Sequence, residues 1–344
     1  MTASYFLGAN SRRGFCSLYG DFASAPGDVL HVIKGGPGTG KSGLMRRIAE
    51  AAEARGYGTE LVLCSGDPDS LDGVYIPALH QAWMDGTAPH IADPAHFGAD
   101  GDYVDLGRFC RLPLPESDRE RVFRLNAAYK LKYAAAYRFL AAAGALHASA
   151  GPAPWDDAAE ERLRRRLRGI LQRSARRGEG CGETRRFLSA ISCRGLLRLP
   201  LPQAYARVYR FDTDRGLAPR ALRIAAEEAA GRGLARILCL SPLDPEEPEA
   251  LLLPGAGLAF LSGDLRAENP RGIRLDALLP PPEREQRTLR RRMRRMESET
   301  LESAVGSLRE AKALHDELES VYRPRMDFAA LTEFTGQLIE KTFG

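Results

Sequence analysis

The chain has 344 residues, of which 44% are hydrophobic and 27% charged, and its formal net charge is +4. This length predicts two domains, and the composition is typical of a water-soluble globular protein. The charge is too small to indicate nucleic-acid binding by itself, and no apolar run is long enough to span a membrane. The beginning of the chain lacks a secretory pattern, and the six cysteines are scattered without a C-x-x-C pair. We therefore expect a cytoplasmic protein with no membrane partner.

The first organised region is a glycine-rich loop between a strand and a helix. Residues 29–33 are an apolar run expected to form a buried strand, and residues 44–55 have helical spacing. Between them lies the P-loop pattern G-x-x-x-x-G-K-S, made of Gly35, Gly36, Pro37, Gly38, Thr39, Gly40, Lys41 and Ser42, with Gly43 next. Backbone N–H groups of such a loop, at a helix N-terminus, bind phosphate. Lys41 would reach the β- and γ-phosphates, and the Ser42 hydroxyl would bind Mg²⁺.

Acidic residues and a histidine follow at the ends of later apolar runs. Asp85 ends one run, where P-loop proteins place the carboxylate that holds Mg²⁺, so Ser42 and Asp85 are the candidate metal ligands. His90 is a candidate to sense the γ-phosphate or to act as a base, and joins Lys41 and Asp85 as a candidate catalytic residue. Asp67 is either a turn residue or part of the site, and the acidic residues just after it either orient a water or lie in a solvated loop.

The sequence contains an internal duplication, which predicts two homologous halves at residues 1–178 and 183–344. A polar, glycine-containing linker near residues 177–180 would join them. The matching segments keep their order along the chain: 6–14 with 187–195, 47–52 with 223–228, 61–68 with 236–245, 82–86 with 259–263, and 145–147 with 313–315.

Each half begins with alternating strands and helices, which predicts a duplicated α/β P-loop fold with a parallel sheet flanked by helices. Each then ends in helices, which we expect to form a C-terminal helical subdomain for that half. The expected helices cover residues 116–150 and 158–176 in the first half and 283–321 and 329–342 in the second. His147 and His315 recur at the same place in both halves, which favours a role in helix packing.

The second half has lost the residues that a nucleotide site needs. At the positions that match Lys41, Ser42 and Asp85 it carries Leu217, Ala218 and Ser262. Asp212 and Asp214 in the same loop would repel a triphosphate. We therefore expect one working site, in the first half. Arg215 and Arg220 lie at the degenerate loop and are candidates for an arginine finger that reaches that site.

Two arginine-rich helices are expected at residues 162–177 and 284–295. The first also has an apolar stripe formed by Leu163, Leu167, Ile170 and Leu171. Such runs are typical of a solvated helix face and are also compatible with nucleic acid or another anionic surface. No aromatic-bearing nucleic-acid motif accompanies the arginines.

Three segments, 34–42, 64–73 and 85–90, resemble a family of uncharacterised bacterial proteins with two tandem P-loop ATPase-like halves. The resemblance covers nearly the whole chain and implies binding of ATP with Mg²⁺ and its hydrolysis. The second half of that family often carries an intact P-loop, and this sequence departs from that pattern at Leu217 and Ala218.

The leading hypothesis is thus a Mg²⁺-dependent NTPase with a single site in the first half. A kinase for a nucleotide or another small molecule is an alternative, in which the helical segment would form a lid over a second substrate. A further alternative, from a different class, is a nucleotide-responsive regulatory protein that turns over slowly and switches its contacts with a partner.

Overall fold

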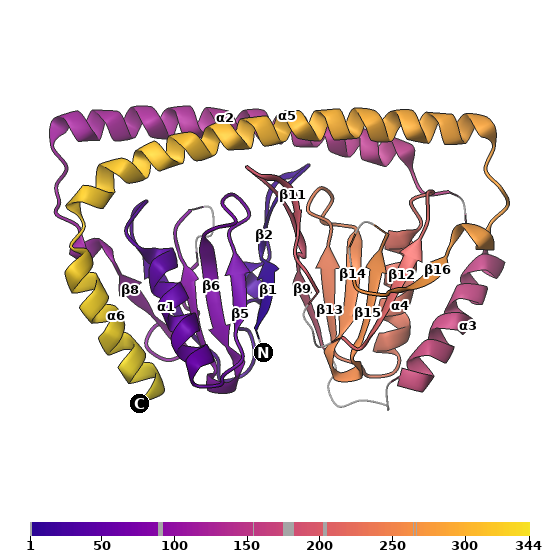
Figure 1. The fold of residues 1–344 in the computed structure, drawn as a ribbon, viewed down its shortest axis with the longest axis horizontal. Coiled ribbons are helices and arrows are strands. Elements are labelled where there is room, and N and C mark those ends of the chain that lie inside the picture. The colour runs from indigo at the N-terminus through magenta and orange to yellow at the C-terminus, as the bar shows by residue number, and fades with distance from the viewer. Residues whose placement is uncertain are drawn as a thin grey trace.

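The computed structural model describes residues 2–88, 92–153, 155–174, 182–201, 205–263, 265 and 267–344. Two α/β halves lie side by side beneath a pair of long helices that crosses both of them (Figure 1). Each half contains a six-stranded sheet, and the two sheets have the same strand order. This arrangement is the one expected of a duplicated α/β fold.

The first sheet has the order β1-β5-β6-β7-β4-β8. Its strands are β1 (Ala3–Phe6), β4 (Val29–Lys34), β5 (Glu60–Leu63), β6 (Leu71–Ile76), β7 (Gln81–Asp85) and β8 (Gly101–Asp105). We expected a parallel sheet, but β6 pairs antiparallel with both β5 and β7, so the sheet is mixed. The connections on either side of β6 are short, and short connections join antiparallel strands because a parallel crossover needs a dozen or more residues.

The second sheet repeats this pattern in the order β9-β13-β14-β15-β12-β16, with β14 reversed. Its strands are β9 (Glu183–Arg186), β12 (Arg207–Asp212), β13 (Arg236–Leu240), β14 (Pro248–Leu253), β15 (Leu258–Ser262) and β16 (Arg271–Arg274). Each half also has a hairpin, formed by β2 (Gly8–Ser11) with β3 (Gly14–Ser17) and by β10 (Ser189–Ser192) with β11 (Gly195–Arg198). Short 3-10 turns η1 to η6 lie at Tyr19–Asp21, Pro77–Leu79, Gly107–Phe109, Pro254–Ala256, Asp276–Leu278 and Arg323–Arg325.

One amphipathic helix packs on each sheet. Helix α1 (Lys41–Ala54) buries Leu44, Met45, Ile48, Ala49 and Ala52, a spacing that places them on one helical face. Helix α4 (Ala218–Ala230) occupies the corresponding place in the second half. Each helix follows a turn at the carboxyl end of a strand. The turn after β4 is rich in glycine, whereas the turn after β12 contains only Gly216.

The helices that follow each sheet are exchanged between the halves. The first half continues into α2 (Glu116–Ala150) and α3 (Asp157–Ser174), and the second into α5 (Arg284–Tyr322) and α6 (Phe328–Phe343). Figure 1 shows α2 and α5 side by side across the top of both sheets, with α3 beside the second sheet and α6 beside the first. With 35 residues, α2 is about 50 Å long, which is enough to cross from one half to the other.

This exchange corrects the expectation that each half carries its own helical subdomain. Leu163, Leu167 and Leu171 of α3 belong to the core of the second sheet, whereas Leu331 of α6 belongs to the core of the first. The apolar stripe of α3 can pack on any complementary apolar face, so its sequence does not specify which sheet it covers. The expected linker near residue 178 lies outside the described residues.

The two halves meet at equivalent positions of the repeat. The N–H of Phe6 donates to the carbonyl of Phe187, and the N–H of Phe187 donates to the carbonyl of Phe6, both at 2.9 Å. Both side chains are fully buried. Because matching residues pair with each other, the halves are related by an approximate twofold axis, like the protomers of an isologous dimer.

Candidate functional site

The glycine-rich loop joins β4 to α1 and turns through two glycines with positive φ. Gly38 has φ +69° and Gly40 has φ +91°, conformations that a side chain would strain. Helix α1 begins at Lys41, directly after Gly40. The Thr39 hydroxyl donates to the carbonyl of Gly36 at 2.8 Å and closes the turn. The loop thus has the strand–turn–helix context that phosphate binding requires.

Lys41 and Asp85 converge at this loop. The Lys41 Nζ donates to the carbonyls of Gly35 at 2.9 Å and Gly36 at 3.0 Å, and lies 3.7 Å from the Asp85 carboxylate. Asp85 is the last residue of β7 and is opposite Ile33 of the neighbouring strand β4. The N–H and hydroxyl of Thr87 donate to the other Asp85 oxygen at 2.9 and 2.6 Å, which fixes the orientation of the carboxylate.

Ser42 follows Lys41 at the start of α1, and its hydroxyl oxygen accepts a hydrogen bond from the N–H of Leu71 at 2.9 Å. Ser42 and Asp85 are oxygen donors of the kind that Mg²⁺ takes in proteins. Among the described residues there is no group of three or more His, Cys, Asp or Glu side chains that could hold a metal ion. Two protein ligands suit Mg²⁺ that is completed by water and by substrate phosphates.

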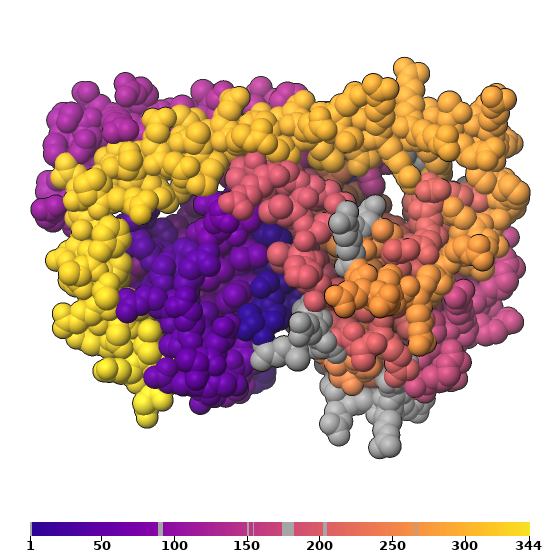
Figure 2. Space-filling model, in the orientation of Figure 1, coloured from indigo at the N-terminus to yellow at the C-terminus, as the bar shows by residue number. Residues whose placement is uncertain are grey.

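The end of α5, which belongs to the second half, covers the glycine loop. A Cβ atom added to Gly38 would lie 2.9 Å from Cγ of Arg323 and 3.2 Å from the carbonyl of Glu319. A Cβ at Gly36 would be 3.8 Å from the ring of Tyr322. In Figure 2, α5 forms a continuous ridge that runs from the second half to the first. The small size of the loop residues is therefore needed for this contact as well as for the turn.

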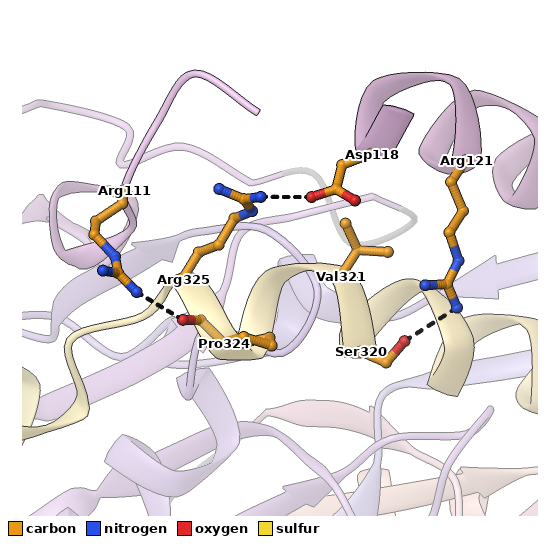
Figure 3. Close-up of a pocket in the computed structure, with 7 residues that line it drawn as sticks. All are labelled: Arg111, Asp118, Arg121, Ser320, Val321, Pro324 and Arg325. Carbon is orange, nitrogen blue, oxygen red and sulfur yellow. Dashed lines mark hydrogen bonds and ion pairs between the residues drawn. The ribbon is translucent and has the colours of Figure 1, made fainter. Parts of the chain in front are cut away.

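A polar junction beside the loop anchors this cover to the first half (Figure 3). The Arg325 guanidinium donates to the Asp118 carboxylate of α2 at 2.6 Å, and Arg111 donates to the carbonyl of Pro324 at 2.9 Å. These groups line a cavity of about 450 Å³ together with Arg121, Ser320 and Val321. Since its central groups already bind one another, we interpret this junction as the attachment of the cover.

One turn earlier, α5 presents Lys312 and His315 to the first half. The Lys312 Nζ lies 3.4 Å from Asp67, and His315 lies 3.7 Å from Glu319. Burial lowers the pKa of His315, and the charges of Lys312 and Lys41 lower it further, whereas Glu319 and Asp316 oppose the shift. The lowered pKa favours the neutral imidazole. Sequence reasoning missed Lys312 and Arg323, and assigned His315 to packing.

The remaining acidic candidates interact with groups outside the glycine loop. Asp72, expected either to orient a water or to lie in a solvated loop, is the second residue of β6, is 4% exposed, and accepts a hydrogen bond from the hydroxyl of Tyr19 at 2.8 Å. Asp69 is exposed and forms an ion pair with Arg194 of the second half. His90 lies outside the described residues. Gly43 is exposed on α1, with nothing within 4 Å of an added Cβ.

The degenerate turn of the second half has the geometry of a shortened loop. Ser262 is opposite Phe211 as Asp85 is opposite Ile33, so the two positions are structurally equivalent. Gly40 comes seven residues after Ile33, whereas Gly216, with φ +68°, comes five after Phe211. The second loop is therefore two residues shorter, and Leu217 is 1% exposed.

The two arginines at this turn have partners in the second half and in the α3 region that packs on it. Arg215 donates to the carbonyl of Pro280 at 2.7 Å. Arg220 donates to Glu160 at 2.6 Å, and its guanidinium lies over the ring of Trp155. An arginine that does lie against the first-half loop is Arg323, which has no ion-pair partner among the described residues.

Arginines of the expected arginine-rich helix at 162–177 are paired within the chain. Arg164 of α3 forms ion pairs with Glu160, Glu227 and Glu228. Arg168 pairs with Glu228 at 2.9 Å. These contacts attach α3 to α4. In the described part of the chain, no helix is both long and apolar enough to cross a membrane.

The described residues form two α/β halves with matching strand order, and a glycine-rich turn joins β4 to α1 in the first half. Comparisons with protein-family models, with curated proteins and with solved structures found no match.

Proposed function

We propose that the first half binds ATP or another nucleoside triphosphate with Mg²⁺ and hydrolyses it, and that the second half has no nucleotide site of its own. The observation that carries this proposal is the contrast between the two glycine turns. At the first turn Lys41 lies 3.7 Å from Asp85, and Ser42 follows Lys41 at the start of α1. The equivalent residues of the second turn are Leu217, Ala218 and Ser262.

The residues of the first turn have distinct roles in this proposal. Loop N–H groups would bind phosphate oxygens, and Lys41 would exchange the carbonyls of Gly35 and Gly36 for the β- and γ-phosphates. Ser42 and Asp85 would hold Mg²⁺, which supplies positive charge opposite the phosphates.

The cover contributes two more groups. The Arg323 guanidinium, on a long side chain that packs against Gly38, would neutralise charge on the transferred phosphoryl group. The neutral His315 imidazole would orient the attacking water or accept its proton. The site would then be complete when the second half donates the end of α5.

Phosphate release tests the proposal. We expect Mg²⁺-dependent release by the wild-type protein and a fall of about 100-fold in Lys41→Ala, because the variant loses charge-assisted bonds to phosphate. The matched control is Lys130→Ala, an exposed lysine of α2. Equal rates in the wild type and Lys41→Ala would overturn the proposal, and release of ADP only with an added acceptor would identify a kinase.

The roles of the cover residues are tested in the same assay. We expect Arg323→Ala to lower kcat by about 100-fold, the effect of removing one preorganised transition-state donor, and Arg309→Ala, an exposed arginine of α5, to leave it unchanged. His315→Gln should lower kcat by about 100-fold or more, with little change in KM. If Arg323→Ala and His315→Gln both left kcat unchanged, the cover would contribute no catalytic group and the site would consist of first-half residues alone.

A nucleotide-responsive switch is the second candidate, and the course of α5 favours it. The helix begins at the second sheet and ends on the glycine loop of the first, so a change at the loop can move it. Thermal stabilisation by Mg²⁺–ATP that depends on Lys41, without phosphate release, would identify the switch.

A further inference from the structure

The second half contains a cavity of about 1280 Å³ at the carboxyl edge of its sheet. The degenerate turn lines it with Thr213, Asp214 and Gly216, and Ser262 of β15 and the end of α2 line other sides. It therefore occupies the place that corresponds to the nucleotide site of the first half. Its volume is sufficient for a small organic molecule.

Two replacements within the repeat help to open this space. In the first half, a Cβ on Gly8 would lie 2.6 Å from the ring of Phe15, so this ring fills the position. The second half has Ser189 in place of Gly8 and Leu196 in place of Phe15, and both line the cavity. Ser189 is 1% exposed, and its hydroxyl has no hydrogen-bond partner among the described residues. An unpaired buried hydroxyl on a cavity wall is a group that a ligand would satisfy.

The acidic groups of the cavity are already engaged by the protein. Asp212 binds Arg210 at 2.7 Å, Asp244 binds Arg12 at 2.8 Å and Glu247 binds His147 at 3.1 Å. The other carboxylates on the wall have partners as well. A cationic ligand would thus have to break existing ion pairs.

Three arginines on the cavity wall have no ion-pair partner among the described residues. Within the described residues, Arg198 of β11, Arg274 of β16 and Arg290 of α5 have no carboxylate within ion-pair distance. Burial lowers the pKa of Arg290, and the nearby charges of Arg215 and Arg294 lower it further, while Asp276 opposes the shift in part. Like charges held together at a partly buried position favour the entry of an anion.

We propose that this cavity binds a small organic anion with two or more phosphate or carboxylate groups, which pair with Arg198, Arg274 and Arg290 and accept a hydrogen bond from Ser189. The ligand binds without Mg²⁺ at the degenerate turn, because Ala218 and Ser262 replace the two metal ligands. The inference is independent of nucleotide hydrolysis in the first half.

Thermal unfolding with pyrophosphate and with citrate, without Mg²⁺ or nucleotide, tests this site. The Lys41→Ala protein is used, so that the first-half loop does not contribute. At tenfold excess over the dissociation constant we expect one of the two anions to raise Tm by about 3 °C. Stabilisation by pyrophosphate would identify a phosphate ligand, and stabilisation by citrate a carboxylate ligand.

Adding Arg290→Gln to Lys41→Ala should abolish this rise and leave the Tm without anion unchanged or higher, because it removes a like charge. Arg287→Gln, on an exposed arginine one turn earlier in α5, is the matched control and should keep the rise. Arg274→Gln provides a second variant, on another element, if Arg290→Gln does not fold. The proposal would be overturned if neither anion raised the Tm. It would also be overturned if the anion raised the Tm equally in Arg290→Gln and in the control Arg287→Gln.

Discussion

The carboxyl edges of the two sheets have the same strand order, the same register and the same kind of covering helix, yet they carry different side chains. The first edge has a full-length glycine loop with Lys41 and Asp85, and aromatic groups such as Tyr129 pack beside His315 above it. The second has a loop two residues shorter, a buried Leu217, and an open cavity lined by arginines. The two halves thus share one architecture while the side chains at equivalent positions of their sheet edges differ.

The histidines of the covering helices show this divergence most directly. His147 of α2 and His315 of α5 occupy the same position of the repeat. His147 lies between Glu247 and Glu297, whose hydrogen bonds raise its pKa to about 10. Burial instead lowers the pKa of His315. The two carboxylates favour the charged form of His147, whereas burial favours the neutral form of His315.

The largest expected effect comes from placing the P-loop lysine into the second half. Leu217→Lys puts an ammonium group at a site that is 1% exposed, and should lower the free energy of unfolding by about 3 kcal/mol or more. It should not create nucleotide binding, because the loop remains two residues too short. Urea unfolding measures the loss, with Ala230→Lys at an exposed position of α4 as the control. A stable variant that binds a second ATP would contradict this expectation. It would show that the halves differ in nucleotide binding because of their side chains alone and not because of loop length.

A smaller effect is expected at the contact between loop and cover. Gly38→Ala would strain a residue with φ +69° and bring its Cβ to 3.2 Å from the carbonyl of Glu319. We expect a loss of about 2–3 kcal/mol in the free energy of unfolding. Gly14 has φ +97°, and nothing lies within 4 Å of a Cβ added there. Gly14→Ala therefore measures backbone strain alone and should lower the free energy of unfolding by about 1 kcal/mol less than Gly38→Ala. Equal losses would mean that the cover does not press on the loop.

The smallest effect is expected from the pH dependence of the two histidines, because the His147 side chain is 41% exposed and water screens its ion pairs. The raised pKa of His147 stabilises the folded protein fully below pH about 6.5, and this contribution is lost as pH rises toward about 10. The lowered pKa of His315 acts in the opposite direction, because the folded state resists protonation as pH falls below about 6.5.

Urea unfolding across this pH range, with His147→Gln and His315→Gln, tests both signs. The stability advantage of the wild type over His147→Gln should shrink above pH about 6.5. Relative to His315→Gln, the wild type should lose stability below that pH. His96→Gln, an exposed histidine paired with Asp100, serves as the control. Parallel pH profiles for the two variants would contradict the assigned difference.

Much of the secondary structure could be predicted from local sequence. The expected helix at 116–150 has the bounds of α2, and the strand expected at 29–33 is β4 with one residue added. Glycines with positive φ and apolar spacing are local signals, and they located the loop and α1 correctly. The sequence repeat also matched the first glycine loop with the turn after β12. This match agrees with the strand register at Ser262.

The remaining features depend on contacts that local sequence does not encode. The direction of β6 follows from short connections, and the exchange of α3 and α6 follows from which apolar faces meet in space. Because the exchange was not predictable, neither was the position of Arg323 against Gly38. The repeated Ala-Leu-His segment could have indicated His315 as a site residue. Each half keeps a histidine on its covering helix, and each of these helices crosses a sheet edge (Figure 1).

A calorimetric titration with Mg²⁺–ATP tests the central claim, a nucleotide site formed by the first-half loop, most directly. The wild type, Lys41→Ala and Arg290→Gln are compared. The account predicts one bound nucleotide per chain in the wild type and Arg290→Gln, and none in Lys41→Ala. Binding that persists in Lys41→Ala would contradict it.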